Sequence, residues 1–234
     1  MLEKIEKNML FDAHFHYFHC KKLGICSFPP SWTGISCAHS KEEWDVQVEA
    51  GENVLQAYGM HPQNAARENV KESADFLEEL IQSKKIIAIG EAGFDYFSDE
   101  YKASKKEQEE IWNIQLDLAF KYKLPLIVHC RKANEKLFEY SKELKNLPEV
   151  LFHSFMGSPV EAYSLINRGI NAYFSFGRQL FNNNKKVISC VRELPFERIL
   201  AETDAPFQFL KGESYTKPDQ IIDVIEEIKK LQGL

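Results

Sequence analysis

The stretch Met9-Leu10-Phe11-Asp12-Ala13-His14-Phe15-His16 joins a short apolar run to two histidines that stand two positions apart. Side chains two apart on a β-strand point to the same face, so both imidazoles can reach one ion. Histidines on a helical zinc site would need a spacing of three or four residues, and the chain contains no His-Glu-x-x-His. The stretch therefore predicts a strand that delivers two metal ligands.

Short apolar runs that end in a ligand-type side chain recur along the whole chain. A carboxylate at the end of a buried strand costs free energy unless a cation or hydrogen bonds compensate. The side chains that follow such runs are His14, His16, His61, Glu91, His129, His153 and Asp204. Taken singly, His129 or His153 is more often a structural histidine than a ligand, but repetition at successive strands favours a metal-dependent active site.

The order of these runs predicts the architecture. Short β-rich runs alternate with longer helical patterns, which is typical of βα units around a parallel sheet. Eight candidate strands end near Asp12, Cys37, Tyr58, Gly90, Val128, Phe152, Ser175 and Ala201. Active sites of α/β barrels lie at the carboxyl ends of the strands, where the candidate ligands fall. We therefore expect an α/β protein with a TIM-like (β/α)8 barrel that forms a single domain over residues 1–234.

Two segments depart from a regular barrel. In Tyr17–Gly34 a helix is expected, but Phe28-Pro29-Pro30 cannot continue one, so we predict a long loop over the barrel mouth and a shortened first βα connection. The C-terminus is short, because the sequence ends after one predicted helix, Pro218–Leu231. The other predicted helices are Ser40–Ala50, Val70–Ser83, Ser104–Lys121, Ala133–Leu144, Pro159–Asn167 and Asn183–Leu194.

The composition restricts the partners and the location of the protein. The chain has 29 basic and 35 acidic residues, and its net charge of −6 argues against a broad basic surface that holds long nucleic acid. No apolar stretch approaches the roughly 20 residues that span a bilayer, and residues 1–8 are charged rather than signal-like. The five cysteines form no Cys-x-x-Cys, which fits a reducing cytosol. We expect a cytoplasmic protein without a membrane contact, and nothing in the sequence indicates an obligate protein partner.

Three of the candidate residues have more than one interpretation. Gly59 and Pro62 flank His61 and would aim its side chain, although a hydrogen-bonded turn histidine shows the same pattern. Arg131 could hold an anionic group of a substrate or form a salt bridge within its loop. Asp204 could bind a metal through one oxygen and accept a proton from the attacking water through the other.

Four further polar residues receive supporting or unrelated roles. Asp95 would either orient a ligand histidine or serve as a turn acid. Glu202 would either orient a neighbour or pair with a cation. His19 and His39 have no accompanying motif residue, so we predict that neither is a metal ligand.

Six short motifs run in order from the first predicted strand to the last. They are Asp12-Ala13-His14-Phe15-His16, Gly59-Met60-His61-Pro62, Gly90-Glu91-Ala92-Gly93-Phe94-Asp95, His129-Cys130-Arg131, Phe152-His153-Ser154-Phe155-Met156-Gly157-Ser158 and Glu202-Thr203-Asp204-Ala205-Pro206. In this combination they resemble the TatD family of metal-dependent deoxyribonucleases. The resemblance implies a metal-dependent hydrolase on a TIM-like barrel, with two divalent ions and phosphodiester substrates.

The resemblance also implies roles for individual residues. It implies two ions bridged by Glu91, the first bound by His14, His16, Glu91 and Asp204 and the second by Glu91, His129 and His153. It places His61 and Arg131 near the substrate phosphate. The ions could be zinc, magnesium, manganese or nickel, since histidine and carboxylate ligands suit several metals. The segment Lys211–Pro218 departs from the family pattern, so the resemblance gives no basis for assigning substrate contacts to this segment.

The leading hypothesis is a deoxyribonuclease that acts as an exonuclease on DNA ends or short nucleic acid with a metal-activated water. A divalent ion lowers the pKa of water from about 15.7 toward about 7. Asp204 and Glu91 would carry the catalysis, and His61 or Arg131 would steady the phosphate. Two alternatives stay open, namely hydrolysis of an ester or amide, including an aminoacyl-tRNA, on the same site, and a barrel that only binds a nucleotide or a partner.

Overall fold

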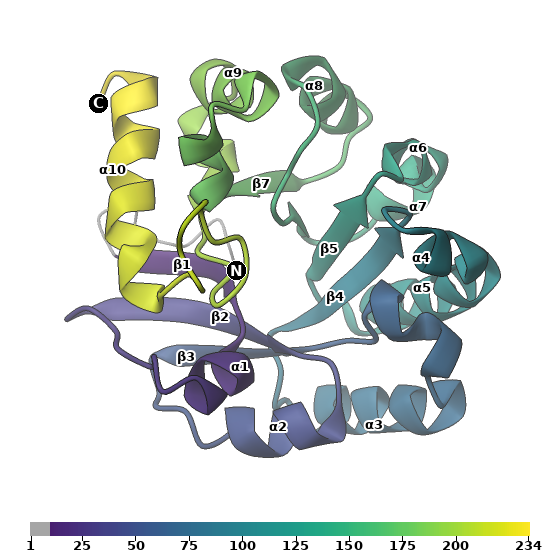
Figure 1. Cartoon of the computed structure of the whole chain (residues 1–234). Coiled ribbons are helices and arrows are strands. Elements are labelled where there is room, and N and C mark those ends of the chain that lie inside the picture. Colours follow the sequence, from purple (N-terminus) through teal and green to yellow (C-terminus); the bar gives the residue numbers. More distant parts are fainter. Residues whose placement is uncertain (1–9) are drawn as a thin grey trace.

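Eight parallel strands form one sheet in which each strand pairs with the next along the chain (Figure 1). The computed structural model describes residues 10–234, so the charged segment 1–8 and Met9 lie outside the described residues. The strands are β1 (Leu10–Phe15), β2 (Trp32–Ala38), β3 (Val54–Tyr58), β4 (Ala88–Asp95), β5 (Leu126–Arg131), β6 (Val150–Phe152), β7 (Ala172–Phe176) and β8 (Ile199–Ala201).

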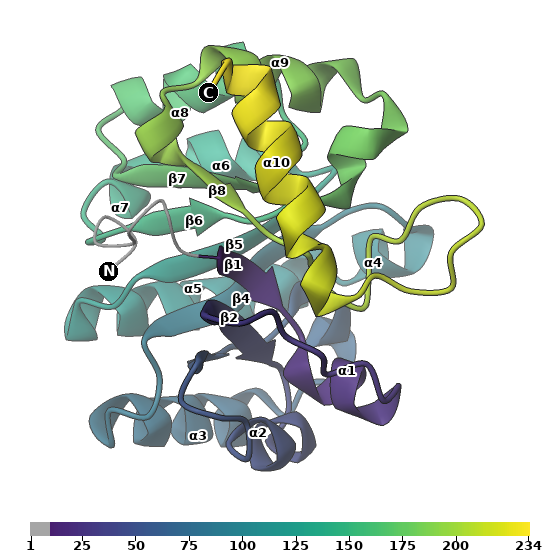
Figure 2. The same ribbon diagram turned by 90° about the vertical axis from the view of Figure 1, so that its left-hand side faces the viewer.

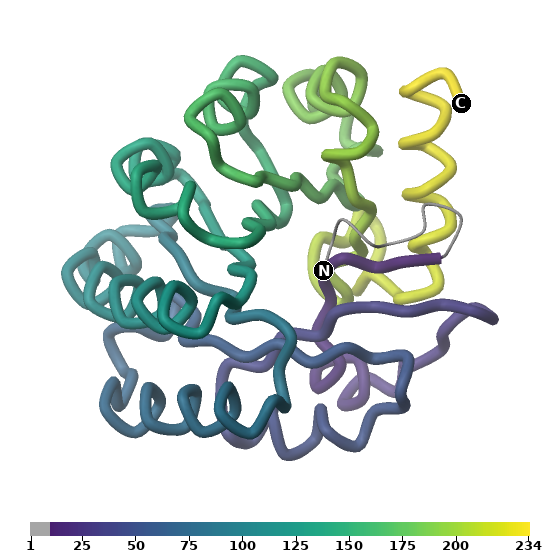
Figure 3. The backbone as a smooth tube through the Cα atoms, turned by 180° about the vertical axis from the view of Figure 1, so that it is seen from behind, coloured from purple at the N-terminus to yellow at the C-terminus, as the bar shows by residue number. Residues whose placement is uncertain are grey.

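The ring closes between the segment after β8 and the end of β1 (Figure 3). The backbone N–H of Asp204 donates to the carbonyl of His14 at 2.9 Å, and the N–H of His16 donates to the carbonyl of Ala205 at 2.8 Å. The buried carboxylate of Asp12 adds to this closure, because it accepts hydrogen bonds from both the backbone and the hydroxyl of Thr203. The expected TIM-like (β/α)8 barrel is confirmed.

Helices surround the sheet and cover its outer face (Figure 1). They are α1 (Tyr17–Lys22), α2 (Lys41–Gln47), α3 (Val70–Gln82), α4 (Asp99–Ala103), α5 (Lys105–Tyr122), α6 (Asn134–Glu139), α7 (Ser141–Leu144), α8 (Pro159–Asn167), α9 (Lys185–Glu193) and α10 (Ile221–Gln232), with 3-10 turns η2 (Pro62–Arg67), η3 (Arg178–Asn182), η4 (Phe196–Arg198) and η5 (Pro218–Gln220). The last helix, α10, lies across β1 and β8 and buries Ile221, Val224 and Ile228 (Figure 2). Among the described residues, no helix combines the length and the apolar character that crossing a membrane requires.

The predicted loop over Tyr17–Gly34 is wrong in its first and last parts. Tyr17–Lys22 forms α1, which buries Phe18 and Cys20, and β2 already begins at Trp32. The helix ends before Gly24, whose φ of +67° is left-handed, so it stops well short of the prolines at 29 and 30, which do not prevent its formation. The first connection is thus short but helical.

The barrel interior is filled by alternate strand residues. On β2 they are Ile35 and Cys37, and β5 and β6 contribute Ile127 and Leu151. A larger apolar layer lies outside the sheet, between the strands and the helices. This alternation decides which side chains beyond each strand point into the barrel mouth.

Two strands break the alternation directly before candidate ligands. On β1 the pairing moves from Asp12↔Gly34 to Phe15↔Ser36, so three steps oppose two on β2. Phe11 and Ala13 face the interior, yet Phe15 joins the outer layer, and the bulge turns His14 inward.

The same irregularity occurs in β4. Its pairing moves from Ile89↔Leu126 to Ala92↔Val128, which turns the Glu91 side chain toward the interior. The predicted strand end at Gly90 is wrong, because β4 continues to Asp95. Glu91 therefore lies within the strand instead of terminating it.

Candidate metal centre

A cavity of about 640 Å³ opens at the carboxyl ends of the strands. Its lining includes His16, His61, Glu91, His129, His153, Arg131 and Asp204. His14 is completely buried beneath these residues. The structure therefore brings together all six predicted metal ligands, and it places the two predicted substrate-binding residues on the wall of the same cavity.

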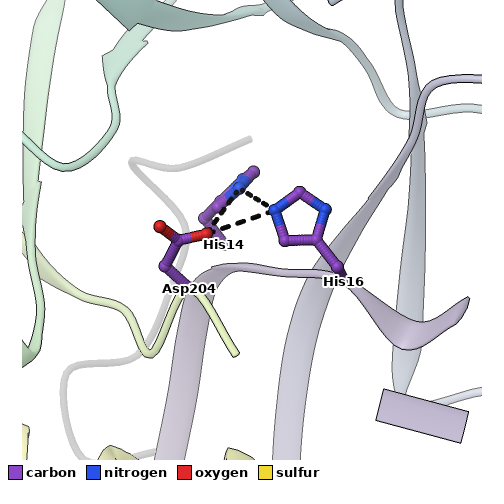
Figure 4. A group of neighbouring side chains, drawn as sticks. All are labelled: His14, His16 and Asp204. Atoms are coloured by element: carbon purple, nitrogen blue, oxygen red, sulfur yellow. Dashed lines mark hydrogen bonds and ion pairs between the residues drawn. The ribbon is translucent and has the colours of Figure 1, made fainter. Parts of the chain in front are cut away.

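The first group of ligand atoms joins β1 to the segment after β8 (Figure 4). The Nε2 atoms of His14 and His16 lie 3.1 Å apart, and Oδ1 of Asp204 is 3.2 Å from the His16 nitrogen and 3.6 Å from the His14 nitrogen. Ligands bound about 2.0–2.2 Å from one zinc ion are separated by about this much. The three side chains form a buried group that fits a divalent ion in its donor atoms and spacing.

Glu91 lies between this group and a second set of histidines. Its Oε1 is 3.3 Å from Nε2 of His14, whereas its Oε2 is 2.6 Å from Nε2 of His153 and 3.2 Å from Nδ1 of His129. Burial alone would raise the pKa of Glu91, but the charges of the surrounding histidines, led by His153 and His14, hold that pKa well below its ordinary value. The carboxylate is therefore ionised and presents one oxygen to each side.

Asp95 orients His129 from behind. Its Oδ2 lies 3.1 Å from Nε2 of His129 and accepts a hydrogen bond from the side-chain amide of Gln63 at 2.8 Å. Burial raises the pKa of Asp95, but the hydrogen bonds from His129 and Gln63 outweigh it and lower the pKa to about 2. With Nε2 engaged by this carboxylate, Nδ1 of His129 is left to face Glu91. The structure bears out both interpretations of Asp95, because its Oδ1 also accepts a hydrogen bond from the backbone N–H of Phe97 at 2.9 Å, as a turn acid does.

The comparison with family models decides the assignment of the chain. The model for the TatD related DNase family matches residues 11–234. The chain belongs to the TatD family.

Relatives of this TatD chain include hydrolases and a nuclease. The uncharacterized metal-dependent hydrolase YabD of Bacillus subtilis is 34% identical over 80% of this chain and 73% of its own. The 3'-5' ssDNA/RNA exonuclease TatD of Erwinia amylovora is 28% identical over 75% of this chain and 67% of its own. The crystal structure of YJJV, a TatD homologue from Escherichia coli, has the same fold, with a TM-score of 0.79 at 24% identity, covering 99% of this chain and 91% of that one.

The TatD assignment makes the chain a metal-dependent hydrolase of the kind that cleaves ester bonds. The cluster of histidine, glutamate and aspartate supplies the donor atoms that such an enzyme needs. The residues themselves fit a divalent ion, because the imidazole and carboxylate atoms of the six predicted ligands converge from five different strands or strand ends.

The two residues of the TatD motifs that were predicted near the substrate lie on the cavity wall. The backbone N–H of Gln63 donates to Nδ1 of His61 at 3.2 Å, which leaves the proton of a neutral ring on Nε2. That nitrogen is 3.6 Å from Oε2 of Glu91. The guanidinium of Arg131 stacks on the ring of Phe97, 3.6 Å from its centre, and no ion pair engages it within the described part of the chain. The alternative of a loop salt bridge for Arg131 is thus not what the structure shows.

The prediction that His39 is not a metal ligand stays a prediction, but the structure places its side chain beside the predicted ligands. Its Nε2 lies 3.1 Å from Oε1 of Glu91, and His16, His39 and Glu91 form a group that could hold an ion. The sequence carried a signal for this position, because His39 continues the alternation of the inward-facing Ile35 and Cys37 just beyond the end of β2. His19 pairs instead with Glu43 at 3.5 Å and belongs to none of the ligand groups found in residues 10–234.

The sequence interpretation also missed Gln208. Its side-chain amide donates to Oδ2 of Asp204 and to the hydroxyl of Ser154, both at 2.7 Å. Oδ1 of Asp204 is thereby turned toward His16. The sequence motifs could not predict this contact, because it depends on the fold of the loop after β8.

Glu202 supports the site from beneath. Its Oε2 accepts a hydrogen bond from Ser175 at 2.6 Å and lies 3.8 Å from Nδ1 of His153. Burial, only partly offset by the charge of His153, raises the pKa of Glu202 to about 7. The contact with His153 fits both roles considered for Glu202, because this neighbour is also a cation when its ring is protonated.

Proposed function

We propose that residues 1–234 form one domain that hydrolyses phosphodiester bonds at the ends of DNA or of short single-stranded nucleic acid, with two divalent ions. The observation that carries the proposal is the position of Glu91, whose two oxygens face two separate groups of histidines. Paired ions of this kind stabilise both the attacking and the leaving oxygen of a phosphodiester in an in-line displacement.

The proposed ligands divide at Glu91. One ion would be held by His14, His16, Glu91 and Asp204, and the other by Glu91, His129 and His153. When bound, divalent ions at these positions supply positive charge to the phosphate and lower the pKa of water. Histidine with carboxylate ligands is compatible with zinc, magnesium, manganese or nickel.

Side chains of this protein would accept the proton and bind the phosphate. Asp204 would accept the proton of the attacking water through a carboxylate oxygen. Burial raises the pKa of Asp204, but the hydrogen bond with His16 and the charge of His14 outweigh it and lower that pKa, which keeps the carboxylate ionised. His61 would donate its Nε2–H to a phosphate oxygen, and Arg131 would contribute its charge at the rim. The stack on Phe97 holds the guanidinium plane in place for this contact.

The cavity wall supports a substrate with unstacked bases. Phe207 and Phe209, 43% and 52% exposed, line the cavity together with the exposed side chain of Met156. Aromatic rings of this kind stack on the bases of single strands without strong sequence preference. The name of the Erwinia relative, a ssDNA/RNA exonuclease, agrees with such a substrate. The net charge of −6 agrees with a site for strand ends, because bound ions would supply the attraction locally.

We place this activity in the cytoplasm. All five cysteines are free thiols, and Cys20, Cys37 and Cys190 are buried. Thiols that persist without pairing are typical of a reducing compartment.

The test is the release of nucleotides from end-labelled single-stranded DNA by metal-stripped protein supplied with magnesium, manganese or zinc. Asp204→Asn should abolish release, and the exposed Asp219→Asn should behave as the wild type. Cleavage of esters or amides with no release of nucleotides by any metal form would refute the nuclease and favour the alternative hydrolase. Ligand binding without any product would favour the binding barrel.

A further inference from the structure

His39 occupies a fixed position directly after β2. Its backbone N–H donates to Oε2 of Glu43 at 2.8 Å, which ties the residue to the first turn of α2. Its Nδ1 faces the carbonyl of Gly59, after β3, at 3.4 Å. The side chain is 8% exposed. Contacts from two neighbouring connections therefore hold the ring and determine which nitrogen faces the cavity.

The contacts of the ring assign its proton. A carbonyl oxygen only accepts hydrogen bonds, so Nδ1 of His39 carries the hydrogen that points at Gly59. In the neutral ring, Nε2 then presents a lone pair to Oε1 of Glu91 at 3.1 Å. Two acceptors at this distance repel each other unless a second ring proton or a metal ion lies between or beside them.

His61 shows the opposite arrangement in the same cavity. Its Nδ1 accepts from the N–H of Gln63, so Nε2 carries the hydrogen and can donate to Glu91. The pair of His61 and Glu91 therefore turns a donor toward an acceptor, although 3.6 Å is too long for a hydrogen bond. The neutral ring of His39 instead turns a lone pair toward Glu91, although the two histidines follow adjacent strands.

We propose that His39 is a metal ligand of this chain and, together with His16 and Glu91, binds the ion nearest β1 and β2, as a donor that the set implied by the TatD motifs does not contain. A backbone carbonyl that accepts from Nδ1–H while Nε2 binds the ion is the usual support of a ligand histidine. Nε2 of His16 lies 3.5 Å from the same oxygen of Glu91, so one ion can contact all three donors. This inference rests on the metal dependence proposed above and is independent of the substrate.

Removal of the His39 side chain should change the number of bound ions or the affinity with which they bind. His39→Ala should remove one bound ion per chain or weaken divalent ion binding at least tenfold, the scale on which supporting contacts of metal ligands act. His19→Ala is the matched control, because His19 lines the same cavity but pairs with Glu43. The control should bind metal as the wild type does.

The experiment uses metal-stripped full-length protein titrated with cobalt and with zinc. Calorimetry gives the affinity and the number of ions, and the visible spectrum of the cobalt form reports the donors around the ion. Circular dichroism of each metal-free variant verifies that it is folded. Added imidazole should restore the cobalt spectrum of His39→Ala if the missing donor is a ring nitrogen.

The outcomes separate this inference from the proposed function. If His39→Ala binds the same number of ions with unchanged affinity and spectrum, His39 is no ligand, while the nuclease proposal stands. If the wild type binds no divalent ion, both fail. If ion binding falls only in His39→Ala and imidazole restores it, His39 is a ligand even where no nuclease activity is found.

Discussion

The hydrogen bond from Gln208 determines how Asp204 presents its carboxylate. The amide of Gln208 holds Oδ2, and Oδ1 consequently faces His16. Gln208 adopts a left-handed backbone with φ of +55°, as does Asp204 with φ of +51°, so the loop turns sharply at both ends of this contact. A residue outside every motif thus positions one of the proposed catalytic groups.

Gln208→Leu should lower kcat about 10- to 100-fold with little change in KM, because Asp204 loses the donor that fixes its orientation. The measurement is steady-state cleavage of single-stranded DNA at saturating metal. Gln82→Leu, which removes an exposed amide that contacts Tyr122, is the control. Equal kcat values for the two variants would show that Gln208 does not position Asp204.

His61 offers a second prediction because its Nε2–H is a donor. His61→Ala should lower kcat about 100-fold, the cost of losing one donor to a developing charge, while the number of bound ions stays the same. His61→Gln, which keeps an N–H donor, should recover part of the rate. Loss of a bound ion in His61→Ala, seen by calorimetry, would instead make His61 a ligand.

At the level of elements, the two bulges in β1 and β4 turn His14 and Glu91 toward the barrel interior, which the sequence pattern alone cannot indicate. The two-residue spacing of His14 and His16 correctly predicted a shared face, and the alternation along β2, β5 and β6 extends to the residues beyond them. The inward turn of His14 and Glu91 depends on the pairing of β1 with β2 and of β4 with β5. Register is a property of two strands, so a pattern within one strand does not reveal it.

The close approach of β4 to β5 gives a stability prediction at Gly93. A Cβ at this position would lie 1.9 Å from the carbonyl oxygen of His129, and φ is +147°. Gly93→Ala should therefore lower the free energy of unfolding by about 2–4 kcal/mol and separate Glu91 from His129. Urea denaturation measures the change.

Gly169→Ala is the matched control for this prediction. Gly169 also has a positive φ, +89°, but no atom lies within 4 Å of the added Cβ. Gly169→Ala should lower the free energy of unfolding by about 1 kcal/mol, from backbone strain alone. Equal losses in the two variants would mean that contact with the His129 carbonyl contributes nothing.

On the scale of the whole molecule, the barrel was predictable and its first connection was not. Eight alternating runs sufficed for the strand order, because each run pairs with its neighbour in sequence. The helix α1 escaped prediction, since its six residues give too short a periodic pattern and the prolines at 29 and 30 favoured a loop. His39 and Gln208 escaped for another reason, because their roles depend on contacts between segments distant in the sequence.

Metal binding should stabilise the whole barrel. An ion that binds only the folded state at 100 times its dissociation constant adds about 2.7 kcal/mol. For a chain of this size that raises the melting temperature by about 5–10 °C. Thermal unfolding of metal-stripped protein with and without zinc measures the shift, and Asp204→Asn should reduce it. An unchanged melting temperature at saturating zinc would contradict a metal site built from the barrel's own strands.

The closure of the ring by residues 204 and 205 against β1 sets a time for assembly during synthesis. His14 and His16 leave the ribosome before Asp204, which follows nearly two hundred positions later. The hydrogen bonds that close the ring join the backbones of these same residues. A nascent chain thus cannot assemble the group of His14, His16 and Asp204 before β8 is made. It can become an active hydrolase only when its barrel is almost complete.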